Sequence, residues 1–122
     1  MSHIVTIATE VRDPDAVAAA CRRLGLPEPV QGTARLFEGQ ATGLLVKLPD
    51  WLYPVVCETA TGVVRYDNYN QRWGKQEHLD RLIQIYSVEK ARIESLKRGH
   101  QVVEKSLADG SIEVTIQVGG VA

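Results

Sequence analysis

The stretch Lys75–Arg98, KQEHLDRLIQIYSVEKARIESLKR, decides the fold class of this chain. Leucine, isoleucine and tyrosine recur in it at spacings of three, four and seven residues, and charged residues fill most other positions. This period predicts an amphipathic helix of roughly 35 Å, long enough to cross a small sheet. Gly99 follows as a favourable helix end. Any sheet in the protein must therefore pack against this helix.

A second, shorter helix is predicted near the start of the chain. Asp13 suits the N-cap and Pro14 the first helical position, and an alanine-rich apolar stripe continues to about Leu24. Gly25 and Pro27 then end the helix. A strand over Ile4–Val11 precedes it, because this segment is rich in β-branched residues.

Strand patterns fill the rest of the chain. Short turns connect the expected strands, which favours antiparallel pairing. The last pair is a hairpin around Asp109–Gly110, with Ile112, Val114, Ile116 and Val118 alternating with polar residues. We expect one α+β domain over 1–122: an antiparallel sheet of about six to seven strands, with one short and one long helix on one face. The expected strands after the first helix are Thr33–Glu38, Thr42–Leu48 (joined around Gly39–Gln40), Pro54–Thr59, Val63–Asp67, Gln101–Leu107 and Ile112–Val118.

Composition excludes several classes of protein. The 122 residues are 44% hydrophobic and carry a net charge of −1, which is ordinary globular usage and gives no evidence for nucleic-acid binding. No apolar run reaches the roughly 20 residues of a membrane span, and the first residues do not resemble a secretory signal. We therefore expect a cytoplasmic protein with no membrane association.

The segment Arg65–Lys75 is the best candidate site, because aromatic, arginine and amide side chains crowd into it. Such side chains stack on rings, pair with phosphate or carboxylate, or read amide edges. The alternative is a loop whose aromatics cover the core. The candidate ligand- or partner-binding residues are Arg65, Tyr66, Asn68, Tyr69, Asn70, Arg72 and Trp73, with His78 one turn into the long helix.

A second candidate surface is the loop between Pro49 and Pro54. Its residues Trp51, Leu52 and Tyr53 either fold back over the core or form an interface. Consecutive apolar residues in the middle strands also indicate that both sheet faces are apolar there. Two helices cover only one face, so we expect a homodimer or small homo-oligomer that buries the other. The alternative is that the loop between Pro49 and Pro54 covers this face by itself, which leaves a monomer.

No sequence motif indicates a catalytic reaction. His3, His78 and His100 are scattered, and neither Cys21 nor Cys57 has metal-ligand spacing or an activating neighbour. We therefore predict no catalytic residues, no metal and no cofactor, and structural roles for both cysteines. A non-enzymatic binding or accessory module that acts through protein–protein contacts is favoured. The alternatives are a small enzyme or anionic-ligand binder using the Arg65–Lys75 loop, and a structural homo-oligomer.

Three features resemble one uncharacterised family. They are Met1-Ser2-His3 before a strand and an Arg12-Asp13 helix start, the segment Asn70–Gly74 leading into the long helix, and the hairpin with Asp109-Gly110. Together they resemble the domain family numbered 1257 among domains of unknown function, found in cyanobacteria and red-algal plastids. The resemblance covers nearly the whole chain. It implies a compact single domain in a bacterial-type cytoplasm, and it implies no activity.

Overall fold

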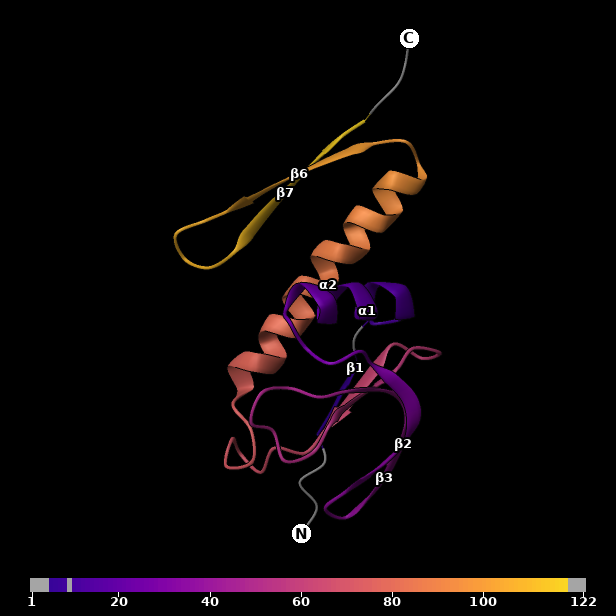
Figure 1. Ribbon diagram of the computed structural model, residues 1–122, viewed down its shortest axis with the longest axis vertical. Coiled ribbons are helices and arrows are strands. Elements are labelled where there is room, and N and C mark those ends of the chain that lie inside the picture. Colours follow the sequence, from indigo (N-terminus) through magenta and orange to yellow (C-terminus); the bar gives the residue numbers. More distant parts are fainter. Residues whose placement is uncertain (1–4, 9, 119–122) are drawn as a thin grey trace.

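The fold is α+β, as predicted (Figure 1). The residues that the structure describes form two helices and seven strands. The structure is a computed structural model that describes residues 5–8 and 10–118. In chain order the elements are β1 (Val5–Ala8), α1 (Pro14–Arg23), β2 (Val30–Leu36), β3 (Gly39–Val46), β4 (Val55–Glu58), β5 (Val63–Tyr66), α2 (Gln76–Lys97), β6 (Gln101–Ser106) and β7 (Ile112–Gln117).

Both helices begin and end close to their predicted limits. Asp13 is the N-cap of α1, and its Oδ1 accepts hydrogen bonds from the N–H groups of Asp15 (2.9 Å) and Ala16 (3.3 Å). α2 is followed by Gly99 in the left-handed region at φ +76°. The capping residues therefore predicted the helix limits within about one residue.

The strands form two sheets, which corrects the prediction of one sheet of six to seven strands. Five strands pair antiparallel in the order β1-β5-β4-β3-β2, and β6 and β7 form a separate ribbon. α2 extends past the five-stranded sheet and places the ribbon at the far end of the molecule (Figure 1). The alternating pattern of β7 has the same appearance whether its apolar face packs on a sheet core or on a helix, so the sequence did not distinguish the two.

Several strand limits also differ from the predictions; β2, for example, begins at Val30 and not at Thr33. The β2–β3 turn lies at Phe37–Glu38 and not at Gly39–Gln40, because β3 already begins at Gly39. β1 ends at Ala8, so Val11 lies outside it and reaches the core from the connection to α1. His3 and Ile4 lie outside the described residues.

One face of the five-stranded sheet contributes to the main core. Side chains that alternate toward this face in β3, β4 and β5 share one buried cluster with both helices. From the sheet these are Leu44, Val46, Val55, Cys57, Val64 and Tyr66, and from the helices they include Val17, Ala20, Leu79, Leu82 and Ile85.

The opposite face has a smaller core of its own. Ala34, Leu36, Ala41 and Val56 are buried there, with Leu45 and Tyr53 packed against them. Two apolar faces were predicted for these strands, and Tyr53 packs on the outer one from the loop between Pro49 and Pro54, which was the alternative to cover by a second subunit. Val56 is already 0% exposed in the single chain, so this part of the outer face does not require a partner. Within the described residues, no helix is long and apolar enough to cross a membrane.

Candidate functional site

The two candidate segments predicted separately form one surface, which we call the loop surface: residues 49–54, residues 67–75 and Phe37. The Leu52 N–H donates to the Trp73 carbonyl (2.9 Å), and the Trp51 Nε1–H donates to the Lys75 carbonyl (3.1 Å). Gly74 lies directly under the Trp51 indole, where a Cβ would clash. These contacts hold the two loops as one unit.

Trp73 is the centre of an aromatic cluster on the loop surface. Its ring centroid lies 4.7 Å from Tyr69 in a stacked arrangement, 5.3 Å from Phe37 and 5.7 Å from Tyr53. Tyr53 also packs on the outer-face core. The aromatics therefore do cover the core, which was one of the two alternatives, but Phe37 remains 52% exposed.

Three of the predicted site residues are structural. Tyr66 is buried in the main core and meets Trp51 edge-on at 5.8 Å. Arg65 forms an ion pair with Glu58 on the neighbouring strand. Asn68 is 4% exposed, and its Nδ2 donates to Gln76 Oε1 (3.3 Å). The buried side chains of Tyr66 and Asn68 are therefore not available to a ligand without rearrangement, whereas that of Arg65 is 35% exposed.

The remaining predicted residues lie at the surface. Leu52 is 60% exposed, and Asn70 and Arg72 are also exposed. The Arg72 guanidinium lies 5.1 Å from the Tyr69 ring centroid, within the range of a cation–π contact. His78 is half-buried and lines a hollow with Arg72.

The backbone of the loop surface is locally strained. Tyr69, Asn70 and Gln71 have φ angles of 45°, 51° and 70°, so three successive non-glycine residues are left-handed. Each costs about 1–2 kcal/mol relative to ordinary backbone. The N–H groups of Arg72 and Trp73 donate to the carbonyls of Tyr69 and Asn68, both at 3.0 Å, which holds this turn.

Asp67 is the feature that sequence reasoning missed. It is 0% exposed, and within residues 5–8 and 10–118 neither of its carboxylate oxygens has a hydrogen-bond partner. Buried polar groups are nearly always paired, and an unpaired buried charge costs several kcal/mol. No sequence signal identifies it, because Asp67 reads as an ordinary strand-end residue.

Two hollows flank the ridge formed by residues 49–54. One is a cleft of about 360 Å³ that has mostly apolar walls and reaches the end of α1. Its lining includes Leu26, Pro27, Lys47, Trp51, Leu52 and Pro54. The other has a volume of about 210 Å³ and is lined by Asp50, Gln71, Arg72, Gly74, Lys75 and His78.

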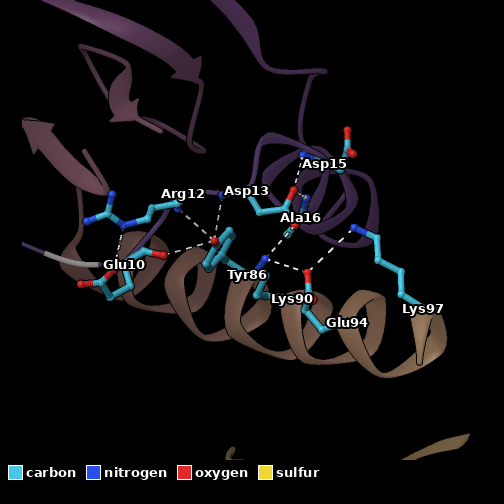
Figure 2. A network of polar contacts seen from close by, with 9 residues as sticks. All are labelled: Glu10, Arg12, Asp13, Asp15, Ala16, Tyr86, Lys90, Glu94 and Lys97. Atoms are coloured by element: carbon cyan, nitrogen blue, oxygen red, sulfur yellow. Dashed lines mark hydrogen bonds and ion pairs between the residues drawn. The ribbon is translucent and has the colours of Figure 1, made fainter. Parts of the chain in front are cut away.

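A group of polar side chains lies between α1 and α2, and these side chains have hydrogen-bond partners. Figure 2 shows Tyr86 reaching from α2 to the backbone before α1. Its hydroxyl accepts from the N–H groups of Arg12 and Asp13 (both 3.1 Å) and donates to the Glu10 carbonyl (3.3 Å). Lys90 Nζ donates to Asp13 Oδ2 (3.1 Å) and Glu94 Oε1 (2.9 Å).

The charge of Asp13 is stabilised by this network. Burial opposes its ionisation, but the hydrogen bond from Lys90 and those from the Ala16 and Asp15 amides outweigh burial and hold the pKa of Asp13 below its ordinary value. On β6, Glu104 accepts two bonds from Arg23 of α1, at 2.5 and 3.1 Å, and one from Arg92 of α2 at 3.0 Å. These hydrogen bonds and ion pairs hold α1, α2 and β6 together.

Neither cysteine has the environment of a nucleophile. Both are buried free thiols. Burial raises the pKa of Cys21 to about 11 and that of Cys57 to about 12. The prediction that Cys21 and Cys57 are buried is confirmed. No metal-binding group of three or more His, Cys, Asp or Glu residues occurs in the described ranges, and His3 lies outside them.

Comparisons with known proteins found no relatives. No protein-family model matches the chain, and neither the curated proteins nor the solved structures include a match. The resemblance to the domain family numbered 1257 therefore stays a prediction.

Proposed function

We propose that this protein is a non-enzymatic binding or accessory module that contacts a protein partner through its loop surface. The observation that carries the proposal is Leu52, an apolar side chain that is 60% exposed on a rigid support. The hydrogen bonds from Leu52 N–H and Trp51 Nε1–H to residues 73 and 75 fix the ridge beneath it. An anchor held in place before binding loses little entropy when it is buried.

The surroundings of Leu52 support a protein partner. Interface hot spots are enriched in tryptophan, tyrosine and arginine, and the loop surface combines Trp73, Tyr53, Tyr69 and Arg72 around the exposed leucine. The apolar cleft beside the ridge offers a place for an aliphatic side chain of the partner. A flat polar surface would offer neither an anchor nor a pocket.

The charges around the ridge indicate the chemistry of the partner. Lys47, Arg72 and Lys75 line the two hollows, and none of them forms an ion pair with any residue that the structure describes. We therefore infer a partner segment with an apolar pocket for Leu52 and carboxylates that face these cations. Such charges raise association rates and make binding weaker in salt.

One observation favours an anionic small ligand as a second candidate. Arg72, Lys75 and His78 converge on the 210 Å³ hollow beside the first turn of α2. Against it, the Gln76 N–H at this helix end already bonds to Gln71 Oε1 (3.1 Å). Titration with inorganic phosphate, followed by amide NMR shifts of residues 72–78, tests this candidate directly.

Two further predictions, the cellular location and the family, also stay proposals. A cytoplasmic location is supported by the two buried free cysteines, because unpaired thiols suit a reducing compartment. Membership of the domain family numbered 1257 is supported only by the sequence features given above.

Site-specific photo-crosslinking tests the binding function. A photo-reactive phenylalanine analogue at Leu52 is expected to capture one protein species in native cells, and the same analogue at Val103 on the distant ribbon is not. The captured protein is then purified and its affinity measured. We expect Leu52→Asp and Arg72→Glu each to weaken binding at least tenfold, because each removes an anchor or reverses a charge.

Matched controls separate binding from folding. Lys105→Glu reverses an exposed charge on the ribbon and should leave the affinity within twofold. All variants should keep the wild-type circular dichroism spectrum. Equal capture at Leu52 and Val103, or unchanged affinity of the Leu52→Asp protein, would contradict the proposal.

A further inference from the structure

We infer that the β6–β7 ribbon joins two copies of this chain by antiparallel pairing of β7 with β7 of the second copy. This surface lies at the opposite end of the molecule from the loop surface (Figure 1), so the inference is independent of the proposed function. It rests on the hydrogen-bonding pattern, the side-chain pattern and the exposure of the ribbon.

β7 has a free edge. In the described part of the chain β7 pairs only with β6. The Leu107 N–H donates to the Ser111 carbonyl (2.9 Å), so the ladder alternation directs the N–H groups of residues 113, 115 and 117 toward β6. The N–H and C=O groups of Ile112, Val114 and Ile116 therefore point outward.

This edge lacks the usual protection against pairing. Natural edge strands carry lysine, proline or bulges. β6 carries Glu104 and Lys105, whereas β7 has a single charged residue, Glu113, and no proline. Two strands alone are also marginally stable in water, and a third or fourth strand adds most to such a ribbon.

The apolar side of β7 is incompletely covered. Ile116 is 45% exposed, Val118 is 75% exposed, and Leu96 at the end of α2 is 55% exposed. A hollow of about 240 Å³ lies between Ile116 and the last turns of α2. The apolar side chains of β7 that α2 does not cover are suited to burial against the apolar side chains of another strand.

The pattern of β7 is complementary to itself. With a two-fold axis at Thr115, Val114 faces Ile116 and Ile112 faces Val118 of the second copy. This register keeps every apolar residue on the helix side and places Glu113 opposite Gln117, so like charges do not face each other. The outward N–H groups then bond across the axis. A two-fold pair of this kind closes on itself, which is why the occupant is a second copy.

Solution mass and cysteine crosslinking test this dimer. Light scattering after size exclusion should give twice the 13.5 kDa of the chain at micromolar concentration. Residue 115 would lie beside its own copy in a pair without hydrogen bonds, where Cα atoms are about 4.5 Å apart. Thr115→Cys should therefore form an intermolecular disulfide on mild oxidation. Val103→Cys, opposite Thr115 on the same face of the ribbon, should not.

Two further variants address the edge itself. Ile116→Pro removes an outward N–H without breaking the β6 ladder, and Ile116→Lys places a charge in the apolar row; both should give the monomer mass. Val103→Lys places a charge on the polar side of β6, away from the axis, and should remain dimeric. A wild-type mass of 13.5 kDa, or equal crosslinking of the Thr115→Cys and Val103→Cys proteins, would overturn the inference.

Discussion

Two aspartates show how differently two regions of this molecule treat a carboxylate. Asp13, between the helices, has 13% of its side chain exposed and accepts bonds from two backbone amides and Lys90. Asp67, beneath the loop surface, is 0% exposed and has no hydrogen-bond partner within the described residues. The network at Asp13 favours one packing of α1 on α2. The site at Asp67 carries a cost that packing alone does not explain, and such costs concentrate at functional sites.

The largest effect is expected where the loop surface is most tightly packed. Gly74→Ala would drive a Cβ into the Trp51 indole, which is held by its bond to the Lys75 carbonyl and its contact with Tyr66. Overpacking of this kind costs about 3 kcal/mol. Urea unfolding should report the loss, and tryptophan fluorescence should shift because the ring moves.

A second glycine provides the control. At Gly32 an added Cβ would meet only Leu45 Cδ1 at 3.5 Å, an ordinary contact. Gly32→Ala should therefore leave stability within about 0.5 kcal/mol or raise it slightly, because alanine loses less backbone entropy than glycine. If Gly74→Ala behaved like Gly32→Ala, the loop surface would not be the rigid support that the binding proposal requires.

The next largest effect is expected at Tyr86, whose hydroxyl joins α2 to the backbone before α1. Tyr86→Phe would leave the N–H groups of Arg12 and Asp13 without their acceptor in a partly buried position. We expect a loss of about 2 kcal/mol in the free energy of unfolding. The Tyr66 hydroxyl accepts no bond from the residues described, so Tyr66→Phe should cost less than about 0.5 kcal/mol. Equal losses would show that the hydroxyl of Tyr86 contributes nothing specific.

The sequence predicted local structure well because local structure has local causes. Asp13, Pro14, Gly25 and Gly99 set the helix limits through capping and backbone geometry, and Asp109–Gly110 set the last turn. These effects act within a few residues, so a single sequence contains them.

The parts that the sequence did not predict depend on contacts between distant residues. The separation of the β6–β7 ribbon follows from where α2 ends in space. The sequence left open whether the loop of Tyr53 or a second subunit covers Val56, and only the packing of distant residues decides between them. The candidate residues Trp51 and Trp73 were found, but their union into one surface was not. Arg65 and Asn68 had the right chemistry for a site, yet their partners Glu58 and Gln76 make them structural.

A smaller effect of opposite sign is expected at Asp67. Asp67→Asn replaces a buried carboxyl group that has no partner among the described residues by an amide of the same shape, which carries no charge at any pH. The variant should be more stable at pH 7 by about 1 kcal/mol, because a neutral amide costs less to bury than an unpaired carboxylate. Chemical denaturation measures this gain. A loss of stability would mean that the Asp67 charge is satisfied in solution and would remove the contrast with Asp13.

The smallest effect is expected when Asp13, the aspartate that has hydrogen-bond partners, is also replaced by asparagine. Asp13→Asn keeps an N-cap of equal quality and loses only the charge facing Lys90, whose side chain is 39% exposed. Because solvent screens such a pair, the expected loss at pH 7 is about 0.5 kcal/mol. The pKa of Asp13 is lowered in the folded state, so its ionisation stabilises the fold above the unfolded pKa near 4, and this contribution disappears as the pH falls through the folded pKa. The difference between wild type and Asp13→Asn should therefore be present at pH 7 and shrink toward zero in acid, as measured by urea unfolding at each pH. A difference that stayed constant with pH would assign the loss to altered capping geometry and not to the charge of Asp13.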